Sequence, residues 1–138
     1  MYQRSALIKA AAPLDFRPKS VAAQKIKKKS ADLNIEFEPA PDILQELGLH
    51  KNGRVLVGFA AETTDHSKNG LEKLKAKNLD FIVVNPVSGP NSAFDSDMNE
   101  ATIIDAAGKT EAIPLISKRA MADRILDKVA DLLTKHVS

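Results

Sequence analysis

The chain has 138 residues, enough for one domain with a substantial core, and its 43% apolar and 28% charged residues are ordinary for a globular protein. It has no cysteine, which excludes disulfides and thiolate metal sites, and its formal net charge of +2 is too small to select a partner by bulk electrostatics. No apolar stretch approaches the ~20 residues that a membrane-spanning helix requires. The composition predicts a single soluble domain in the cytoplasm, with no membrane partner.

The chain opens with an apolar, strand-like run at residues 6–12. This run begins almost at the amino terminus, and the abrupt start leads us to expect that an upstream portion is missing. Residues 21–29 follow as small and then basic residues without period-2 alternation, which predicts a mobile loop.

Residues 33–37 alternate apolar with polar side chains, which predicts a strand with one wet face. Pro39 and Pro41 are expected to end it, because proline cannot donate a backbone hydrogen bond. Asp42 is then positioned to cap a short helix that stops at Gly48.

The middle of the chain predicts a strand, a helix and a second strand. Residues 54–59 are the candidate for a central strand, and the amphipathic helix after it is expected to be capped by Ser67 or Asn69. Residues 80–85 form another apolar run. This βαβ order predicts a parallel pair joined by a right-handed crossover.

The last part of the chain predicts a loop, a hairpin and a helix. Residues 87–99 are rich in glycine, proline, serine and asparagine, and the strand-like residues 101–105 and 111–115 are expected to pair around a turn at residues 107–108. The helix over residues 118–135 is expected to bury one apolar stripe. The stripe consists of Ala122, Ile125, Leu126, Val129, Leu132 and Leu133. An α/β fold follows from these elements.

A ligand site is expected where the buried strand ends, because open α/β sheets bind ligands at the carboxyl ends of their strands. Residues 54–63 run from apolar to small and then acidic, and lysines flank them at residues 25–29, at Lys73 and at Lys77. Phosphate is the natural ligand for lysines that approach from two sides. Solvated lysines are the competing interpretation, and the sequence alone weighs the two about evenly for residues 25–29.

Other interpretations of these residues have less support. A nucleic-acid surface would use the same lysines, but the chain has one tyrosine, five phenylalanines, no tryptophan and no recognisable nucleic-acid motif. Phe59 is positioned either to stack on a nucleobase or, as is commoner for such a residue, to pack in the core. Four carboxylates are candidates for Mg²⁺, although their spacing diagnoses no metal site. They are Glu62, Asp65, Asp95 and Asp97.

Ordered segments over nearly the whole chain resemble phosphopantothenoylcysteine synthetase, the carboxyl-terminal part of a bifunctional coenzyme A biosynthesis decarboxylase and synthetase. The matching segments are Ala10-Ala-Ala12, Asp15-Phe-Arg-Pro18, Ala23-Gln-Lys-Ile-Lys-Lys28, Pro41-Asp-Ile43, Gly58-Phe-Ala-Ala-Glu-Thr63, Lys73, Lys77-Asn-Leu-Asp80, Asn85 and Phe94-Asp-Ser-Asp97.

The resemblance implies a Rossmann-like, three-layer α/β fold with a mostly parallel sheet and a late antiparallel hairpin, and usually a homodimer. It implies a CTP-dependent ligation of 4'-phosphopantothenate to L-cysteine, assisted by Mg²⁺, with no flavin on this part and no nucleic acid as a partner. The acid attacks the α-phosphate of CTP to give an acyl-cytidylate and pyrophosphate, and the cysteine amine then displaces CMP.

The same resemblance implies the site residues. Lys25 matches the catalytic lysine that supports acyl-nucleotide formation, a role suited to charge stabilisation at a phosphate. The remaining positions match nucleotide contacts. These are Ala10, Ala11, Asp15, Pro41, Asp42, Ile43, Leu44, Phe59, Lys73 and Lys77.

The chain also departs from the family pattern. It has no equivalent of the upstream half, with its glycine-rich turn and the Thr-Asn-x-Ser-Ser-Gly segment that helps hold phosphopantothenate. Two hypotheses follow: residues 1–138 are a single α/β domain that supplies the nucleotide-binding part of the synthetase, or they are a non-catalytic nucleotide-binding fragment or module.

Overall fold

The computed structural model describes residues 5–25, 34–87 and 96–135. The chain divides into two compact units, one formed by Met1–Ala10 and Leu44–Ser138 and the other by Ala11–Ile43. We call them the sheet unit and the ribbon unit and describe each by itself. The assignment of all residues to one domain stays a prediction.

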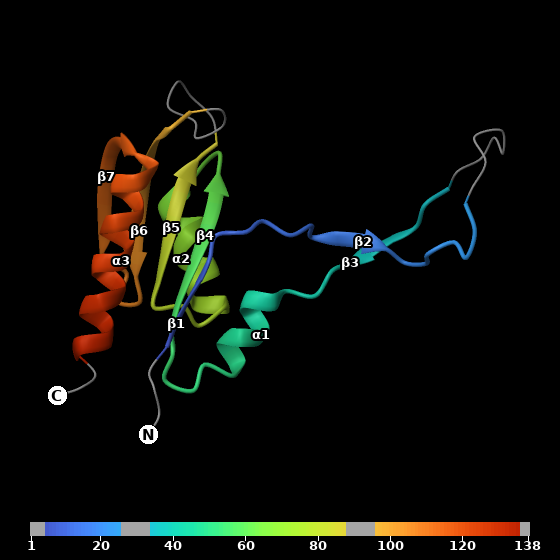
Figure 1. Cartoon of the computed structure of the whole chain (residues 1–138), viewed down its shortest axis with the longest axis horizontal. Helices are drawn as coiled ribbons and strands as arrows, with labels where there is room; N and C mark the ends of the chain where they lie inside the picture. Colours follow the sequence, from blue (N-terminus) through green and yellow to red (C-terminus); the bar gives the residue numbers. More distant parts are fainter. Residues whose placement is uncertain (1–4, 26–33, 88–95, 136–138) are drawn as a thin grey trace. The chain divides into compact units, whose positions relative to one another are not determined.

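The sheet unit contains a five-stranded sheet in the order β1-β4-β5-β6-β7 (Figure 1). Its strands are β1 (Ala6–Lys9), β4 (Val55–Glu62), β5 (Phe81–Pro86), β6 (Met98–Asp105) and β7 (Thr110–Ser117). Its helices are α1 (Ile43–Leu49), whose first residue falls in the ribbon unit, α2 (His66–Ala76) and α3 (Lys118–Lys135).

The sheet is mixed, which corrects the expectation of a mostly parallel one. β1 pairs with β4 and β4 with β5 in parallel, whereas β5–β6 and β6–β7 are antiparallel. The β4–α2–β5 unit and the β6–β7 hairpin are therefore confirmed. The sequence did not predict that β6 joins β5 antiparallel, because an antiparallel neighbour needs no crossover helix to mark it.

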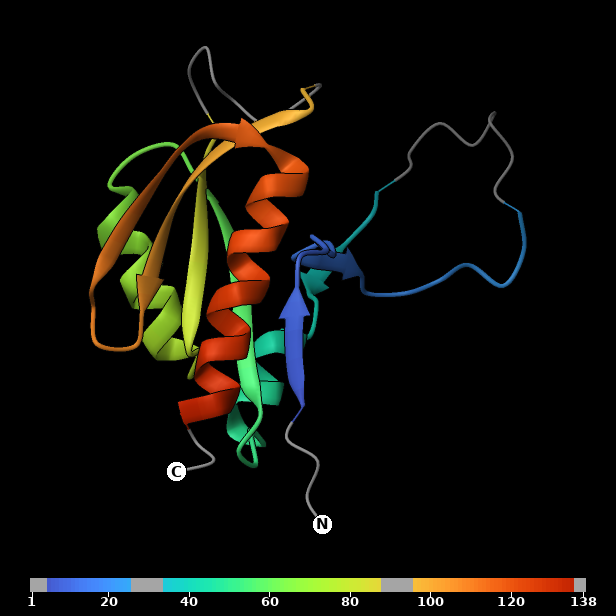
Figure 2. The ribbon, with the colours of Figure 1, turned by 60° about the vertical axis from the view of Figure 1, so that its left-hand side comes forward.

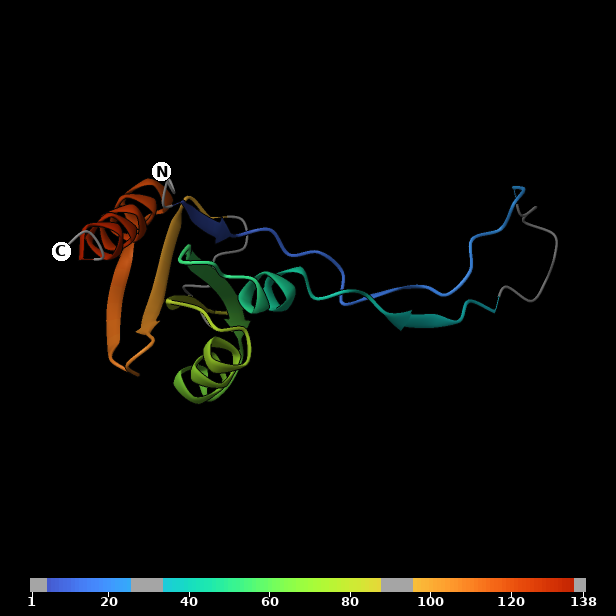
Figure 3. The same cartoon turned by 90° about the horizontal axis from the view of Figure 1, so that it is seen from below.

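Two apolar clusters lie on opposite faces of this sheet. One packs α3 on the sheet through Val57, Phe81, Ile103, Ile125 and their neighbours. The other packs α1 and α2 on the opposite face, and Figures 2 and 3 show helices on both sides of the sheet. β5 reads as a continuous apolar run because residues on both of its faces are buried. The sheet unit thus has three layers.

The α3 helix has the predicted bounds, and most of its predicted stripe is confirmed: Ile125 and Val129 are buried, and Leu132 and Leu133 pack partly buried against the same cluster. Met121, Ile125 and Val129 are buried, and the row they form at four-residue spacing faces the sheet. Leu126 is 53% exposed, and Ala122 is also exposed. The helix therefore contacts the sheet along a narrower row than its apolar residues suggested.

Two element ends and the position of one strand differ from the sequence-based expectation. α1 continues one residue past Gly48, to Leu49. The glycine serves a close approach instead, because an added Cβ would lie 2.1 Å from the carbonyl oxygen of Lys77. Asp65 is the residue before α2, and the Asn69 side chain bonds Glu62 and the Thr64 carbonyl instead of capping the helix. β4 lies beside the middle strand, β5, and is not itself central.

The ribbon unit contains two short antiparallel strands, β2 (Phe16–Pro18) and β3 (Phe37–Pro39). An ion pair joins Arg17 to Glu38 at 2.7 Å across them. The strand expected at residues 33–37 is thus displaced, and Pro39 lies within β3 rather than beyond its end. A two-stranded ribbon tolerates this proline because its nitrogen can face outward. Residues 26–29 of the expected basic loop lie outside the described residues.

Within the described ranges, no helix is long and apolar enough to cross a membrane.

Candidate functional site

The ends of β4 and β5 lie side by side and form what we call the carboxyl edge of the sheet. Ala61 is paired with Asn85 and Glu62 with Pro86, and the Val87 N–H donates to the Glu62 carbonyl at 3.1 Å. Both strands run in the same direction, so their last residues reach one edge. The residues that change from apolar to small and acidic therefore end where a ligand site is expected.

Ala10 and Phe59 come to this edge from neighbouring strands. Ala10 follows Lys9, which pairs with Gly58, and Phe59 is the next residue of β4. The Phe59 side chain is half-buried and packs against the cluster under α3. The packing interpretation of Phe59 is thus supported, and a contact with a nucleobase stays a prediction for its remaining exposed part.

Lys73 and Glu62 form an ion pair that links α2 to the end of β4. The carboxylate is only 13% exposed, and its second oxygen accepts from Asn69 Nδ2 at 3.2 Å. The hydrogen bond from Lys73 lowers the pKa of Glu62 below its ordinary value, although burial acts in the opposite direction. Glu62 therefore stays ionised and holds a lysine ammonium, itself 45% exposed, near the carboxyl edge.

Lys77 follows the last residue of α2, four positions after Lys73, and its side chain is partly buried. Lys77 is the residue after α2, on the face opposite α3, whereas Phe59 packs toward α3. The backbone of Lys77 lies near the starts of β4 and β5: its carbonyl approaches Gly48, and the Asp80 N–H donates to the Leu56 carbonyl at 2.9 Å. The structure therefore brings Lys73, but not the backbone of Lys77, to the carboxyl edge.

Leu44 belongs to the core. It is 4% exposed, and a Cβ placed on Gly58 would lie 3.0 Å from its side chain. Any contact of Leu44 with a nucleotide would therefore involve its backbone.

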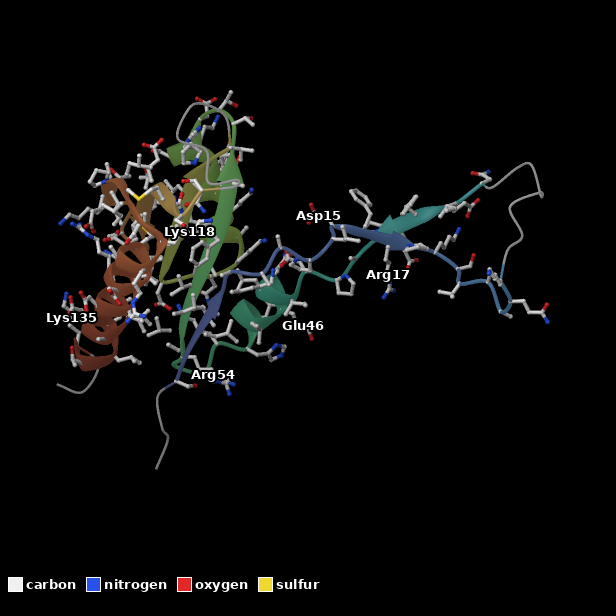
Figure 4. All side chains as sticks on the ribbon, turned by 45° about the horizontal axis from the view of Figure 1, so that its top comes forward. Asp15, Arg17, Glu46, Arg54, Lys118 and Lys135 are labelled. Atoms are coloured by element: carbon white, nitrogen blue, oxygen red, sulfur yellow. The ribbon has the colours of Figure 1, made fainter. Side chains whose placement is uncertain are left out.

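The other residues implied by the resemblance lie in the ribbon unit, and all are exposed. They are Ala11, Asp15, Lys25, Pro41, Asp42 and Ile43. Asp15 stands just before β2, where its carbonyl accepts from the Ala40 N–H at 2.8 Å (Figure 4). The convergence of Lys25 with Lys73 and Lys77 stays a prediction.

No group of three or more metal-binding side chains occurs among the described residues. Of the four candidate carboxylates, Glu62 is paired with Lys73, and Asp65 precedes α2 in the left-handed conformation, with φ 47°. Asp97 is exposed beside the start of α3, where its carbonyl accepts from the Lys118 N–H. Asp95 lies outside the described residues. Among the described residues, Glu62, Asp65 and Asp97 do not form a metal-binding group.

The sequence analysis missed two polar contacts at this edge. One is the bond from Asn69 to Glu62, and the other joins the buried Asn99 of β6 to Asn85 at 3.2 Å. An asparagine directly after an apolar run, as at Asn85, was the available indication for the second contact, but it does not identify the partner.

The fold and this edge define an α/β domain with a ligand site expected at the carboxyl ends of its parallel strands. A protein-family model described as the DNA/pantothenate metabolism flavoprotein C-terminal domain matches residues 1–133.

Individual relatives agree with this match. The coenzyme A biosynthesis bifunctional protein CoaBC of Bacillus subtilis (strain 168) is 42% identical over 126 residues, covering 91% of this chain and 31% of that protein. A cysteine/cysteine sulfinic acid decarboxylase from an unknown prokaryotic organism is 40% identical over 127 residues, covering 91% and 35%. A crystal structure of the C-terminal domain of CoaBC superposes with a TM-score of 0.74 and 33% identity, covering 95% of this chain and 56% of that one.

The chain therefore belongs to the DNA/pantothenate metabolism flavoprotein C-terminal domain family. The resemblance to phosphopantothenoylcysteine synthetase is confirmed. The chain spans about a third of the length of the curated relatives it matches.

Proposed function

We propose that this chain is the nucleotide-binding part of a phosphopantothenate–cysteine ligase in coenzyme A biosynthesis, and that it acts in the cytoplasm. Family membership over residues 1–133 is the observation that carries the proposal. The carboxyl edge supports it, because the end of β4 carries Phe59 on the face toward α3 and, through Glu62, holds the ammonium of Lys73 on the opposite face.

In the proposed reaction, the carboxylate of 4'-phosphopantothenate attacks the α-phosphate of CTP, and the bond from that phosphorus to pyrophosphate breaks. The amine of L-cysteine then attacks the acyl carbon, loses a proton and displaces CMP. Lys25 is assigned to stabilise charge on the α-phosphate. Lys73 and Lys77 are assigned to the β- and γ-phosphates, where an ammonium can follow a phosphate as it leaves.

Mg²⁺ would enter this site with the nucleotide. Magnesium in nucleotide enzymes commonly keeps several waters and is held by phosphate oxygens with one or two carboxylates. Asp15 and Asp42 are the two carboxylates among the assigned nucleotide contacts, and we assign no protein ligand to the ion.

A homodimer is part of the proposal. The β2–β3 ribbon carries Phe16 and Phe37 at 58% and 61% exposure, and an isolated two-stranded ribbon is marginally stable in water. Covering these rings with a second copy of the chain would bury apolar surface that the ribbon unit leaves exposed.

The proposal is tested by incubating the chain with CTP, 4'-phosphopantothenate, L-cysteine and Mg²⁺ and measuring pyrophosphate. The full-length enzyme provides the sharper test: Lys25→Gln should leave folding intact and suppress acyl-cytidylate formation. Lys19→Gln is the matched control, because Lys19 is an exposed lysine of the same unit paired only at the surface with Glu36. Full turnover by Lys25→Gln would refute the assigned role.

A non-catalytic nucleotide-binding fragment or module is the alternative function. CTP binding without pyrophosphate release would support this alternative, whereas pyrophosphate release would exclude it. ATP must be compared with CTP in both assays, because the choice of CTP rests on the resemblance.

A further inference from the structure

Asn99 is a buried polar side chain in an otherwise apolar environment. It is 9% exposed, and Ala101 and Ile103, which follow it on the same face of β6, belong to the core cluster under α3. Its Nδ2 donates to Asn85 Oδ1 at 3.2 Å. Its own Oδ1 is buried and has no hydrogen-bond partner among the described residues.

The register of β5 with β6 brings Asn99 near Asn85: Val84 is paired with Thr102, which puts Asn85 level with Ala101, two residues from Asn99. The hairpin is also irregular on the other side of Asn99. Asn99 is paired with Ile116 and Ala101 with Ile113, so β7 advances three residues where β6 advances two. The extra residue of β7 falls next to Pro114, which cannot donate to the ladder. Such bulges redirect side chains next to functional sites.

Stability does not account for an asparagine at this position. An apolar side chain of similar size would avoid the cost of burying an acceptor without a donor. What the asparagine supplies is an N–H donor to Asn85. That bond fixes the orientation of the Asn85 amide, with its oxygen toward Asn99 and its nitrogen turned away.

Asn85 lies on the carboxyl edge, paired with Ala61 of β4, on the face toward which Phe59 packs. Its side chain is half-buried. We propose that Asn99 is a positioning residue for nucleotide binding: it orients the Asn85 amide so that Nδ2 is presented as a donor to an acceptor atom of the nucleotide. This inference rests on the proposed function.

The test is a double-mutant cycle on the full chain, with binding of CTP and Mg²⁺ measured by calorimetry and stability by thermal unfolding. Asn99→Leu should weaken CTP binding about three- to tenfold, the effect of losing one oriented hydrogen bond, while the unfolding temperature stays equal or rises. Asn85→Leu should weaken binding at least as much. Adding Asn99→Leu to Asn85→Leu should cause no further loss, because Asn99 acts through Asn85.

Asn99→Asp serves as the matched isostere, and it also serves if Asn99→Leu fails to fold: it keeps the size of the side chain but offers Asn85 an acceptor in place of the donor. It should bind CTP no more tightly than Asn99→Leu, and CTP binding equal to that of the wild type would contradict the inference. Unchanged CTP binding in Asn99→Leu, or independent losses in the double variant, would overturn the inference. Wild-type chain that does not bind CTP would instead refute the proposed function, and this inference with it.

Discussion

Replacing Glu62 with glutamine should strengthen the binding of CTP. In the free chain, the Lys73 ammonium is paired with the Glu62 carboxylate, and a polyphosphate must compete with that carboxylate for the same cation. Glutamine keeps the size of the side chain and can still accept from Asn69, but it removes the negative charge. The substitution therefore separates competition for Lys73 from the local structure of the β4–α2 connection.

The magnitude follows from the exposure of the pair. Glu62 is 13% exposed but Lys73 is 45% exposed, so water screens the attraction, and such pairs contribute about 0.5–1 kcal/mol. If this energy no longer opposes nucleotide binding, the dissociation constant for CTP should fall about two- to fivefold. The gain should shrink as ionic strength rises, because exposed charges are screened.

The same substitution should lower stability at neutral pH by a similar amount. The folded-state pKa of Glu62 is lowered from about 4.5, chiefly by the hydrogen bond from Lys73, so its stabilising effect is fully present above pH 4.5. That effect is lost as the pH falls through the lowered folded value. The difference in unfolding free energy between wild type and Glu62→Gln should therefore disappear in acid.

Calorimetric titration with CTP and Mg²⁺ at low and high salt measures the binding effect, and urea unfolding across pH measures the stability effect. Glu72→Gln is the matched control, because it removes one negative charge from an exposed position of the same helix. Weaker CTP binding by Glu62→Gln would refute the competition. An equal gain in Glu72→Gln would show that net charge alone is responsible.

Two further predictions concern the packing that holds the site. Gly48→Ala should destabilise the chain by about 1–3 kcal/mol in urea unfolding, because the added Cβ would lie 2.1 Å from the Lys77 carbonyl oxygen. Gly53→Ala is the control: Gly53 has φ +76° and nothing within 4 Å of an added Cβ, so only backbone strain of about 1 kcal/mol is expected. A smaller loss for Gly48→Ala than for Gly53→Ala would contradict the close approach of α1 to α2. Ile125→Ala should lower the free energy of unfolding by about 2–5 kcal/mol, because Ile125 is buried, and Leu126→Ala should lower it by less than about 1 kcal/mol, because Leu126 is 53% exposed. Equal losses for the two variants in urea unfolding would contradict the observed buried row of α3.

Long periodic elements could be predicted from the sequence. The helix over residues 118–135 and the β4–α2–β5 unit were recognised because their apolar spacing repeats over many residues. The edge of the row that faces the sheet could not be predicted, since Leu126 is as apolar as Ile125 but is exposed. Which of them is buried depends on where α3 lies on the sheet, a tertiary property.

Short elements and side-chain partners were the parts that the sequence could not supply. Gly48 has the residue type of a helix stop, but the structure uses it for contact with the Lys77 backbone, which is distant in sequence. β2 has three residues and includes Pro18, so it has no periodic pattern of its own. The contact of Asn99 with Asn85 likewise depends on the register between β5 and β6, which residue type does not reveal.

The most direct test of the account is the difference in affinity between CTP and CMP, measured by calorimetry in the presence of Mg²⁺. Lysines gathered around one polyphosphate predict that CTP binds at least about tenfold more tightly than CMP, a difference of ~1.4 kcal/mol. Lys25→Gln, Lys73→Gln and Lys77→Gln should each reduce that ratio. Equal affinity for the two nucleotides, or a ratio unaffected by all three substitutions, would contradict the assignment.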